Sequence, residues 1–112
     1  MRFGAIDIGT NAVRLIIKEV HQFEEKYESF KICYTRVPIR LGADVFTQGS
    51  IGSIKKDQLL NTMKAFKILM EVQGVANYRA CSTSAMREAR NGSEVVEYIG
   101  EQAGIKLEIL SG

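Results

Sequence analysis

The sequence contains too few cysteine and histidine residues to suggest a disulfide framework or a thiolate–imidazole metal site. Its two cysteines, Cys33 and Cys81, lie in apolar runs typical of strands, which predicts buried structural thiols. The single histidine, His21, lies in a polar stretch with no cysteine or second histidine beside it. We therefore expect His21 to be a solvated loop residue rather than a metal ligand.

Charge of one sign and long apolar runs are also scarce. The 15 basic and 13 acidic side chains leave a net charge of +2, and the signs are mixed along the chain, so no nucleic-acid partner is predicted. Asp7 interrupts the N-terminal apolar run, which suits neither a signal peptide nor a membrane span, and the expected location is the cytoplasm. A length of 112 residues leaves room for a single domain, residues 1–112. The apolar fraction of 46% is typical of a globular protein.

The first third of the chain is predicted to form three antiparallel strands. In the second strand Val13, Leu15 and Ile17 alternate with other residues and share one face. The connections between the strands are short, which is typical of hairpins. Pro38, the only proline, falls where the third strand should end. The predicted strands are residues 2–8, 12–20 and 26–38.

The period of the apolar pattern changes in the middle of the chain. Residues 40–52 are polar and rich in glycine, and we predict a loop there, of a length that tends to be functional. Apolar residues then recur at helical spacing from Ile54 to Gln73. Ser53 is the predicted N-cap of this helix and Gly74 lies just beyond its C-terminus.

The last third alternates between strands and helices. A strand is predicted at 78–81, one or two helical turns at 85–90, a helix at 94–103 and a strand at 105–110. The element order is therefore β-β-β-α-β-α-β. Because strands separated by helices need parallel crossovers, the predicted fold is α/β, with a mixed five-stranded sheet and helices packed on it.

The turn from Asp7 to Asn11 is the first candidate site. Gly9 can adopt backbone angles that let consecutive N–H groups converge, and Thr10 and Asn11 add polar side chains beside them. Such a concavity binds phosphate, and Asp7 could hold a cation or orient a water. A plain hairpin turn explains the same spacing equally well.

Two further segments carry candidate anion ligands. Ser82-Thr83-Ser84 lies between a strand and a helix and is followed by Arg87 and Arg90, although an N-cap with two solvated arginines is the simpler interpretation. Arg40 follows the third strand, and a surface arginine explains it as well. In an open α/β sheet, ligands collect beyond the carboxyl ends of the parallel strands. If the first strand and the strand before Ser82 are neighbours, these segments share one rim.

Together the three segments resemble the N-terminal part of the exopolyphosphatase/guanosine pentaphosphate phosphohydrolase family. The chain's last residues, Gly104 to Gly112, also resemble the family segment that precedes its catalytic region. The resemblance therefore spans the chain in order and spacing. The three segments are Asp7-Ile8-Gly9-Thr10-Asn11-Ala12-Val13-Arg14-Leu15, Arg40-Leu41-Gly42 and Ser82 to Gly92.

This resemblance implies one lobe of an actin-like, ribonuclease-H-like fold that is used in two copies closing on a cleft. It implies hydrolysis of a terminal phosphate from polyphosphate or guanosine pentaphosphate by an attacking water. Asp7 would help to hold Mg²⁺ or its waters. The other implied ligands are Gly9, Thr10, Asn11, Arg40, Ser84 and Arg87, all contacting phosphate. The implied partners are polyphosphate, guanosine penta- or tetraphosphate, and a second lobe of the same protein.

Two departures from the family pattern matter. Ala12 stands where the family usually has serine, and the catalytic glutamate and second phosphate loop would both follow Gly112. We therefore expect this lobe to be inactive alone, and its exposed apolar surface to favour a homodimer. Two alternatives stay open. One is a lobe of an actin-like sugar or acid kinase or ATPase, and the other is a non-catalytic module that senses guanosine tetraphosphate or polyphosphate.

Overall fold

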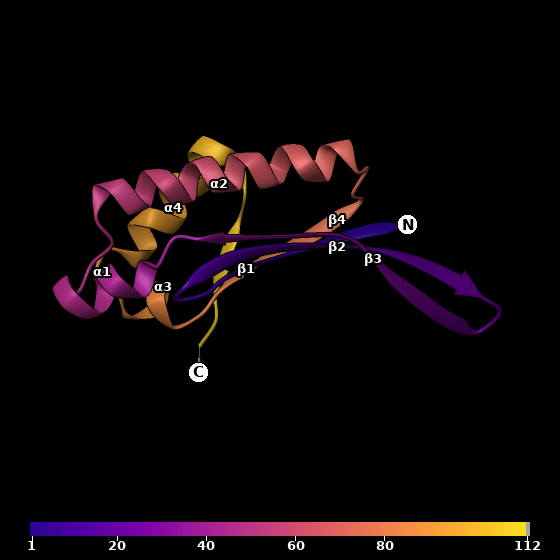
Figure 1. Ribbon diagram of the computed structural model, residues 1–112, viewed down its shortest axis with the longest axis horizontal. Coiled ribbons are helices and arrows are strands. Elements are labelled where there is room, and N and C mark those ends of the chain that lie inside the picture. The colour runs from indigo at the N-terminus through magenta and orange to yellow at the C-terminus, as the bar shows by residue number, and fades with distance from the viewer. Residues whose placement is uncertain (112) are drawn as a thin grey trace.

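The computed structural model describes residues 1–111, which form five strands and four helices around one mixed sheet (Figure 1). The strand order across the sheet is β3-β2-β1-β4-β5. The strands are β1 (Arg2–Ile8), β2 (Ala12–Phe23), β3 (Lys26–Pro38), β4 (Asn77–Ser82) and β5 (Leu107–Ile109). The helices are α1 (Leu41–Gln48), α2 (Ser53–Val72), α3 (Ser84–Glu88) and α4 (Gly92–Ala103).

Chain connectivity explains the mixture of strand directions. Short turns join β1, β2 and β3, and these strands pair antiparallel. Helical crossovers lead into β4 and β5, so β4 runs parallel to β1, and β5 runs parallel to β4. The predicted element order and the mixed five-stranded sheet are confirmed, with α1 as an additional helix.

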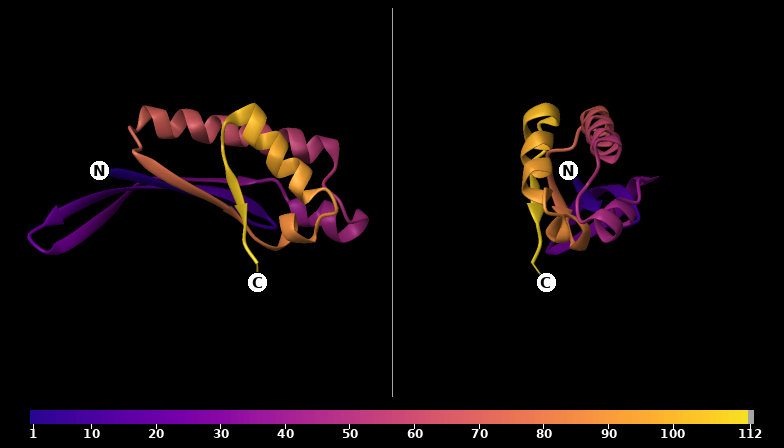
Figure 2. Two further views of the ribbon diagram at one scale, coloured as in Figure 1. Left: turned by 180° about the vertical axis from the view of Figure 1, so that it is seen from behind. Right: turned by 90° about the vertical axis from the view of Figure 1, so that its left-hand side faces the viewer.

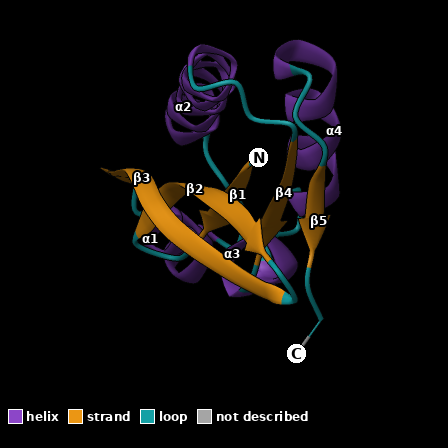
Figure 3. Ribbon diagram, turned by 90° about the vertical axis from the view of Figure 1, so that its right-hand side faces the viewer, coloured by secondary structure: helices purple, strands orange, loops and turns teal. Residues whose placement is uncertain are grey.

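Helices α2 and α4 lie side by side over one face of the sheet (Figure 3). The strands alternate, so that Ile6, Ile8, Val13, Leu15 and Ile17 are all buried beneath the helices. From α2 the buried residues Leu59, Met63, Phe66 and Met70 complete this core with Val95 and Ile99 of α4. Burial of each large side chain contributes about 1.5–3 kcal/mol. The opposite face carries exposed polar residues, including Asp7 and Arg14.

The β2–β3 hairpin runs far beyond the rest of the sheet (Figure 2, left). These strands have 12 and 13 residues, whereas β1 has 7. Because β2 continues to Phe23, the prediction that His21 lies in a loop is wrong, although its side chain is exposed as expected. The turn at Glu24 has a φ of 57°. Residues 21–32 have exposed side chains throughout.

The loop predicted for residues 40–52 is wrong, because Leu41–Gln48 form helix α1. Leu41 and Val45, one helical turn apart, are buried in the core and fix this helix. Gly49 ends it in the left-handed conformation, with a φ of 77°. The glycines that suggested a loop therefore end the helix or allow its close packing.

Other local expectations need smaller corrections. Gly52, not Ser53, is the N-cap of α2, whereas Gly74 follows the helix with a φ of 64° as expected. Cys33 and Cys81 are free and half-buried rather than fully buried. Within residues 1–111, no helix combines the length and the apolar character needed to cross a membrane.

Candidate phosphate-binding site

Three sequence segments meet where β1 ends. The backbone N–H of Arg40 donates to the Asn11 carbonyl over 2.8 Å, and the N–H of Gly42 donates to the Thr10 carbonyl over 2.9 Å. On the other side of β1, Ile8 is paired with Ser82 of β4, as the shared rim requires. Figure 1 shows α1 and α3 together at this end of the sheet, far from the projecting hairpin. The rim therefore joins the turn after β1, the start of α1 and the end of β4.

The turn after β1 differs in detail from the sequence-based expectation. Gly9 is outside the left-handed region, and its N–H donates to the Ala12 carbonyl over 3.0 Å, so that donor is used within the hairpin. A Cβ atom at Gly9 would lie 3.1 Å from the Ala12 carbonyl oxygen, which explains glycine here by close approach. The N–H groups of Thr10 and Asn11 have no acceptor among residues 1–111. These two N–H groups are the turn's free donors.

Asp7 lies on β1, on the sheet face that the helices leave open, and its side chain is exposed. Its cross-strand neighbours are Arg14 on β2 and Cys81 on β4, and Arg14 in turn faces Arg36 on β3. Like charges placed opposite each other destabilise a strand pair, so an anion near Arg14 and Arg36 would be favourable. The alternation of residues along a strand predicts which sheet face Arg14 and Arg36 occupy. Only the pairing register shows that these two arginines lie in line with Asp7 across the sheet.

Arg40 is the N-cap residue of α1, and its side chain is exposed. Its backbone has a φ of 61° and a ψ of 51°, a left-handed conformation that is uncommon outside glycine. Because its N–H is bound to Asn11, Arg40 adjoins the free donors of the turn. The guanidinium forms no ion pair or hydrogen bond within the described residues and is available to an anion.

The segment from Ser82 to Arg90 is only partly directed to the rim. Ser84 begins α3 and is half-buried. Ser82 is fully buried, on the same face as Ile6 and Ile8, so its hydroxyl is not available to an anion at the surface. Arg87 donates from Nη1 to the Leu110 carbonyl over 2.8 Å.

Arg90 stabilises the fold instead of offering a free guanidinium. Its Nη2 donates to the Gln48 carbonyl over 2.8 Å, and its backbone N–H donates to the Gly49 carbonyl over 2.9 Å. Asn91 bonds both the N–H and the carbonyl of Ile51 through its side-chain amide, each over 2.9 Å. These bonds hold the α1–α2 connection against the segment between α3 and α4.

The donor set fits a magnesium ion that is held by few protein ligands. Among residues 1–111 no three side chains of histidine, cysteine, aspartate or glutamate cluster together. The exposed Asp7 carboxylate makes no hydrogen bond or ion pair with any other residue of the range 1–111. Mg²⁺ commonly binds through one or two carboxylates and keeps its remaining positions for water and phosphate oxygens. Asp7 can supply that one protein ligand.

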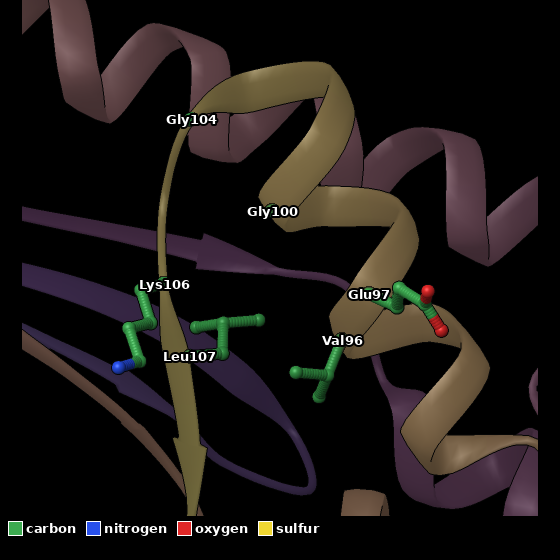
Figure 4. A pocket seen from close by; sticks show the side chains of 6 residues that line it. All are labelled: Val96, Glu97, Gly100, Gly104, Lys106 and Leu107. Atoms are coloured by element: carbon green, nitrogen blue, oxygen red, sulfur yellow. The ribbon is translucent and has the colours of Figure 1, made fainter.

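A hollow elsewhere on the surface lacks these features. It lies between α4 and β5, where Val96 and Leu107 point toward each other, and Glu97 and Lys106 are directed away (Figure 4). Its floor is therefore apolar, which does not suit a phosphate.

Several solved structures have folds similar to that of this chain. The Ppx/GppA protein of Aquifex aeolicus superposes with a TM-score of 0.88 at 27% identity, over 98% of this chain and 35% of that one. An exopolyphosphatase from Cytophaga hutchinsonii gives a TM-score of 0.89 at 27% identity, over 100% of this chain and 35% of that one. The α/β, ribonuclease-H-like fold expected from the resemblance is thereby confirmed.

Sequence comparison gives the same result. Exopolyphosphatase 1 of Mycobacterium tuberculosis is 29% identical over 112 residues, which are 100% of this chain and 32% of that protein. The chain thus spans about a third of the length of such relatives. The model of the Ppx/GppA phosphatase family matches residues 9–112. The chain therefore belongs to the Ppx/GppA phosphatase family.

Proposed function

We propose that this chain is the phosphate-binding lobe of a hydrolase that removes the terminal phosphate of inorganic polyphosphate or guanosine pentaphosphate. Membership of a phosphatase family supports the hydrolase class, and the similarity to exopolyphosphatases favours a phosphoric anhydride as the substrate. The observation that carries the proposal is the pair of free N–H groups of Thr10 and Asn11, with Asp7 and Arg40 beside them.

Each group has a distinct role in this proposal. The N–H groups of Thr10 and Asn11 donate to phosphate oxygens, and Arg40 adds a planar, permanently charged donor. Ser84 and Arg87 contact the phosphate chain from the far side of β1, and for Arg87 this requires exchange of its bond to Leu110. Asp7 would hold Mg²⁺ with its waters. The bound ion would offset negative charge on the phosphates.

The lobe alone is proposed to bind phosphate without hydrolysing it. Phosphoryl transfer depends on positioning and on charge stabilisation around the reacting group, and one lobe contacts it from one side only. A second lobe, belonging to the longer protein that the relatives' lengths suggest, would supply the opposite side. The glutamate that activates the attacking water is expected in the segment after Gly112.

A phosphate-release assay on the full-length protein tests the proposal. Polyphosphate and guanosine pentaphosphate are offered separately with Mg²⁺, and release from at least one is expected. Asp7→Ala and Arg40→Ala should each reduce kcat/KM by tenfold or more, about the loss of one charge-assisted contact. Lys64→Ala, an exposed change on α2, is the matched control and should be neutral. Absence of release from both substrates would contradict the proposal.

A further inference from the structure

We propose that Lys55 and Asp44 are positioning residues that hold Arg40 in its left-handed conformation beside the phosphate-binding turn. The inference rests on the proposed role of Arg40 as a phosphate ligand, and it assigns the residues that fix its geometry. Neither Lys55 nor Asp44 lies in the segments that resemble the phosphohydrolase family. Both come from the part of the chain around α1 and the first turn of α2.

The conformation of Arg40 requires support from its surroundings. A φ of 61° brings the Cβ atom of a non-glycine residue close to its own backbone, and such conformations persist where surrounding contacts over-determine them. Asparagine or aspartate can stabilise this conformation through a short polar side chain, but arginine cannot. Glycine would adopt it freely. The presence of arginine indicates that the side chain itself is used.

Lys55 supplies the decisive contact. Its Nζ donates to the Arg40 carbonyl over 2.7 Å, and the Ala43 N–H donates to the same oxygen over 3.1 Å. The Arg40 N–H is fixed on the other side by the Asn11 carbonyl, over 2.8 Å. Both ends of this one residue are therefore held, by α2 through Lys55 and by the phosphate-binding turn through Asn11.

Asp44 in turn fixes the position of Lys55. Its Oδ1 lies 3.1 Å from Lys55 Nζ, and its Oδ2 accepts the N–H of Gly52 over 2.8 Å. Both side chains of the ion pair are only 21% exposed, so the pair is partly shielded from water. Burial acts to raise the pKa of Asp44, but the Gly52 N–H and the Lys55 ammonium outweigh it and keep that pKa below its ordinary value.

These contacts do not serve the packing of the arginine side chain. The guanidinium of Arg40 is exposed and has no partner among residues 1–111. The only parts of Arg40 that are fixed are its backbone groups, and they determine the direction in which the side chain leaves. The contacts of the Arg40 backbone with Lys55 and Asn11 thus direct its side chain, so that the guanidinium can reach the region next to the free N–H groups of the turn.

A double-mutant cycle on this chain tests the assignment, with inorganic tripolyphosphate as the calorimetric ligand. Lys55→Met should weaken binding by about tenfold, the loss expected when one positioned charge-assisted contact is disrupted. In an Arg40→Ala background the same change should have little further effect, because Lys55 acts through Arg40. Lys55→Arg should restore part of the affinity. Lys64→Met, on the exposed face of α2, controls for the loss of one positive charge.

Nuclear magnetic resonance of the same variants reports the backbone directly. The Cα and Cβ shifts of Arg40 should indicate the left-handed conformation in the wild type and Lys64→Met, and lose it in Lys55→Met and Asp44→Leu. Equal weakening by Lys55→Met in both backgrounds would overturn the positioning role, and so would unchanged Arg40 shifts. If the wild type does not bind tripolyphosphate, the proposed function fails for this lobe, and the Arg40 shifts still decide the positioning role.

Discussion

At the scale of single residues, the side chain of Ser82 is in an unfavourable position for a polar group. Its Oγ is buried without a hydrogen-bond partner among the described residues, and the residue is 0% exposed. A buried hydroxyl that lacks a partner loses its bonds to water without replacing them. Its register partner on β1 is the apolar, buried Ile8.

Replacement of this hydroxyl should therefore increase stability. Ser82→Ala removes the unpaired oxygen and leaves a cavity too small to matter, so the free energy of unfolding should rise by about 1 kcal/mol. Urea denaturation measures this change. Ser29→Ala, at an exposed position of the hairpin, should stay within about 0.5 kcal/mol of the wild type. A loss of stability in Ser82→Ala would mean that the hydroxyl has a partner, such as an internal water.

Residue-scale prediction of the site from sequence was incomplete for a definite physical reason. The motif at Asp7–Asn11 predicted a turn, but not that the Gly9 N–H donates to the Ala12 carbonyl within it. Arg36 was missed because its position beside Arg14 depends on the pairing register of β2 and β3. Register follows from the hydrophobic face and the turn length together, and neither is visible at a single residue.

At the scale of elements, the first residue of α4 is packed too closely against the end of α3 to carry a side chain. A Cβ atom at Gly92, the first residue of α4, would collide with the backbone oxygen of Met86. In the same helix Gly100 is exposed, and the nearest atom to its Cβ would be the Ile105 oxygen at 3.9 Å, an ordinary contact. Helix α4 therefore contains one glycine, Gly92, that leaves no room for a Cβ atom, and another, Gly100, that leaves room for one.

The two glycines give a matched pair of substitutions. Gly92→Ala should destabilise the fold by about 3 kcal/mol, because a backbone group must move to admit the methyl group. Gly100→Ala should stabilise it by roughly 0.5–1 kcal/mol, since alanine has the higher helix propensity. Thermal unfolding of both variants measures the difference. Equal effects of the two substitutions would contradict this description of the α3–α4 connection.

Most elements were predictable from the sequence, and α1 shows what limits such prediction. Strands and α2 carry a clear apolar period over many residues, whereas α1 has 8 residues and only Leu41 and Val45 to mark its buried face. Gly42 weakens a helical interpretation further. Glycine suits this position because a Cβ there would lie 3.2 Å from both Thr10 Cβ and the Phe46 ring, and the contact to Thr10 depends on tertiary structure.

At the scale of the whole molecule, the projecting hairpin is the largest departure from a compact shape. It carries Phe23, Tyr27, Phe30 and Tyr34, with exposed fractions of 73%, 71%, 52% and 49%. The register places Phe23 and Phe30 on one face of the hairpin and Tyr27 and Tyr34 on the other, and exposed apolar side chains of this kind promote association. The edge strand β3 also has unpaired backbone groups along its outer side, since β2 is its only neighbour.

We expect this chain to self-associate through the hairpin. Light scattering after size-exclusion chromatography should give a mass above that of a monomer that rises with concentration. The double substitution Phe23→Ser and Tyr27→Ser should reduce the association. Ile54→Ser, equally exposed at 74% but on α2, should not. A wild-type monomer at high concentration, or an equal effect of Ile54→Ser, would contradict this role of the hairpin.

The turn after β1 is proposed to bind phosphate through the N–H groups of Thr10 and Asn11. Titration of the ¹⁵N-labelled chain with tripolyphosphate tests this binding at the two donors themselves. We expect saturable amide shifts that are largest at Thr10 and Asn11, with smaller shifts around Arg40 and with no change at the far end of the hairpin. Shifts confined to exposed lysines, with Thr10 and Asn11 unmoved, would contradict it.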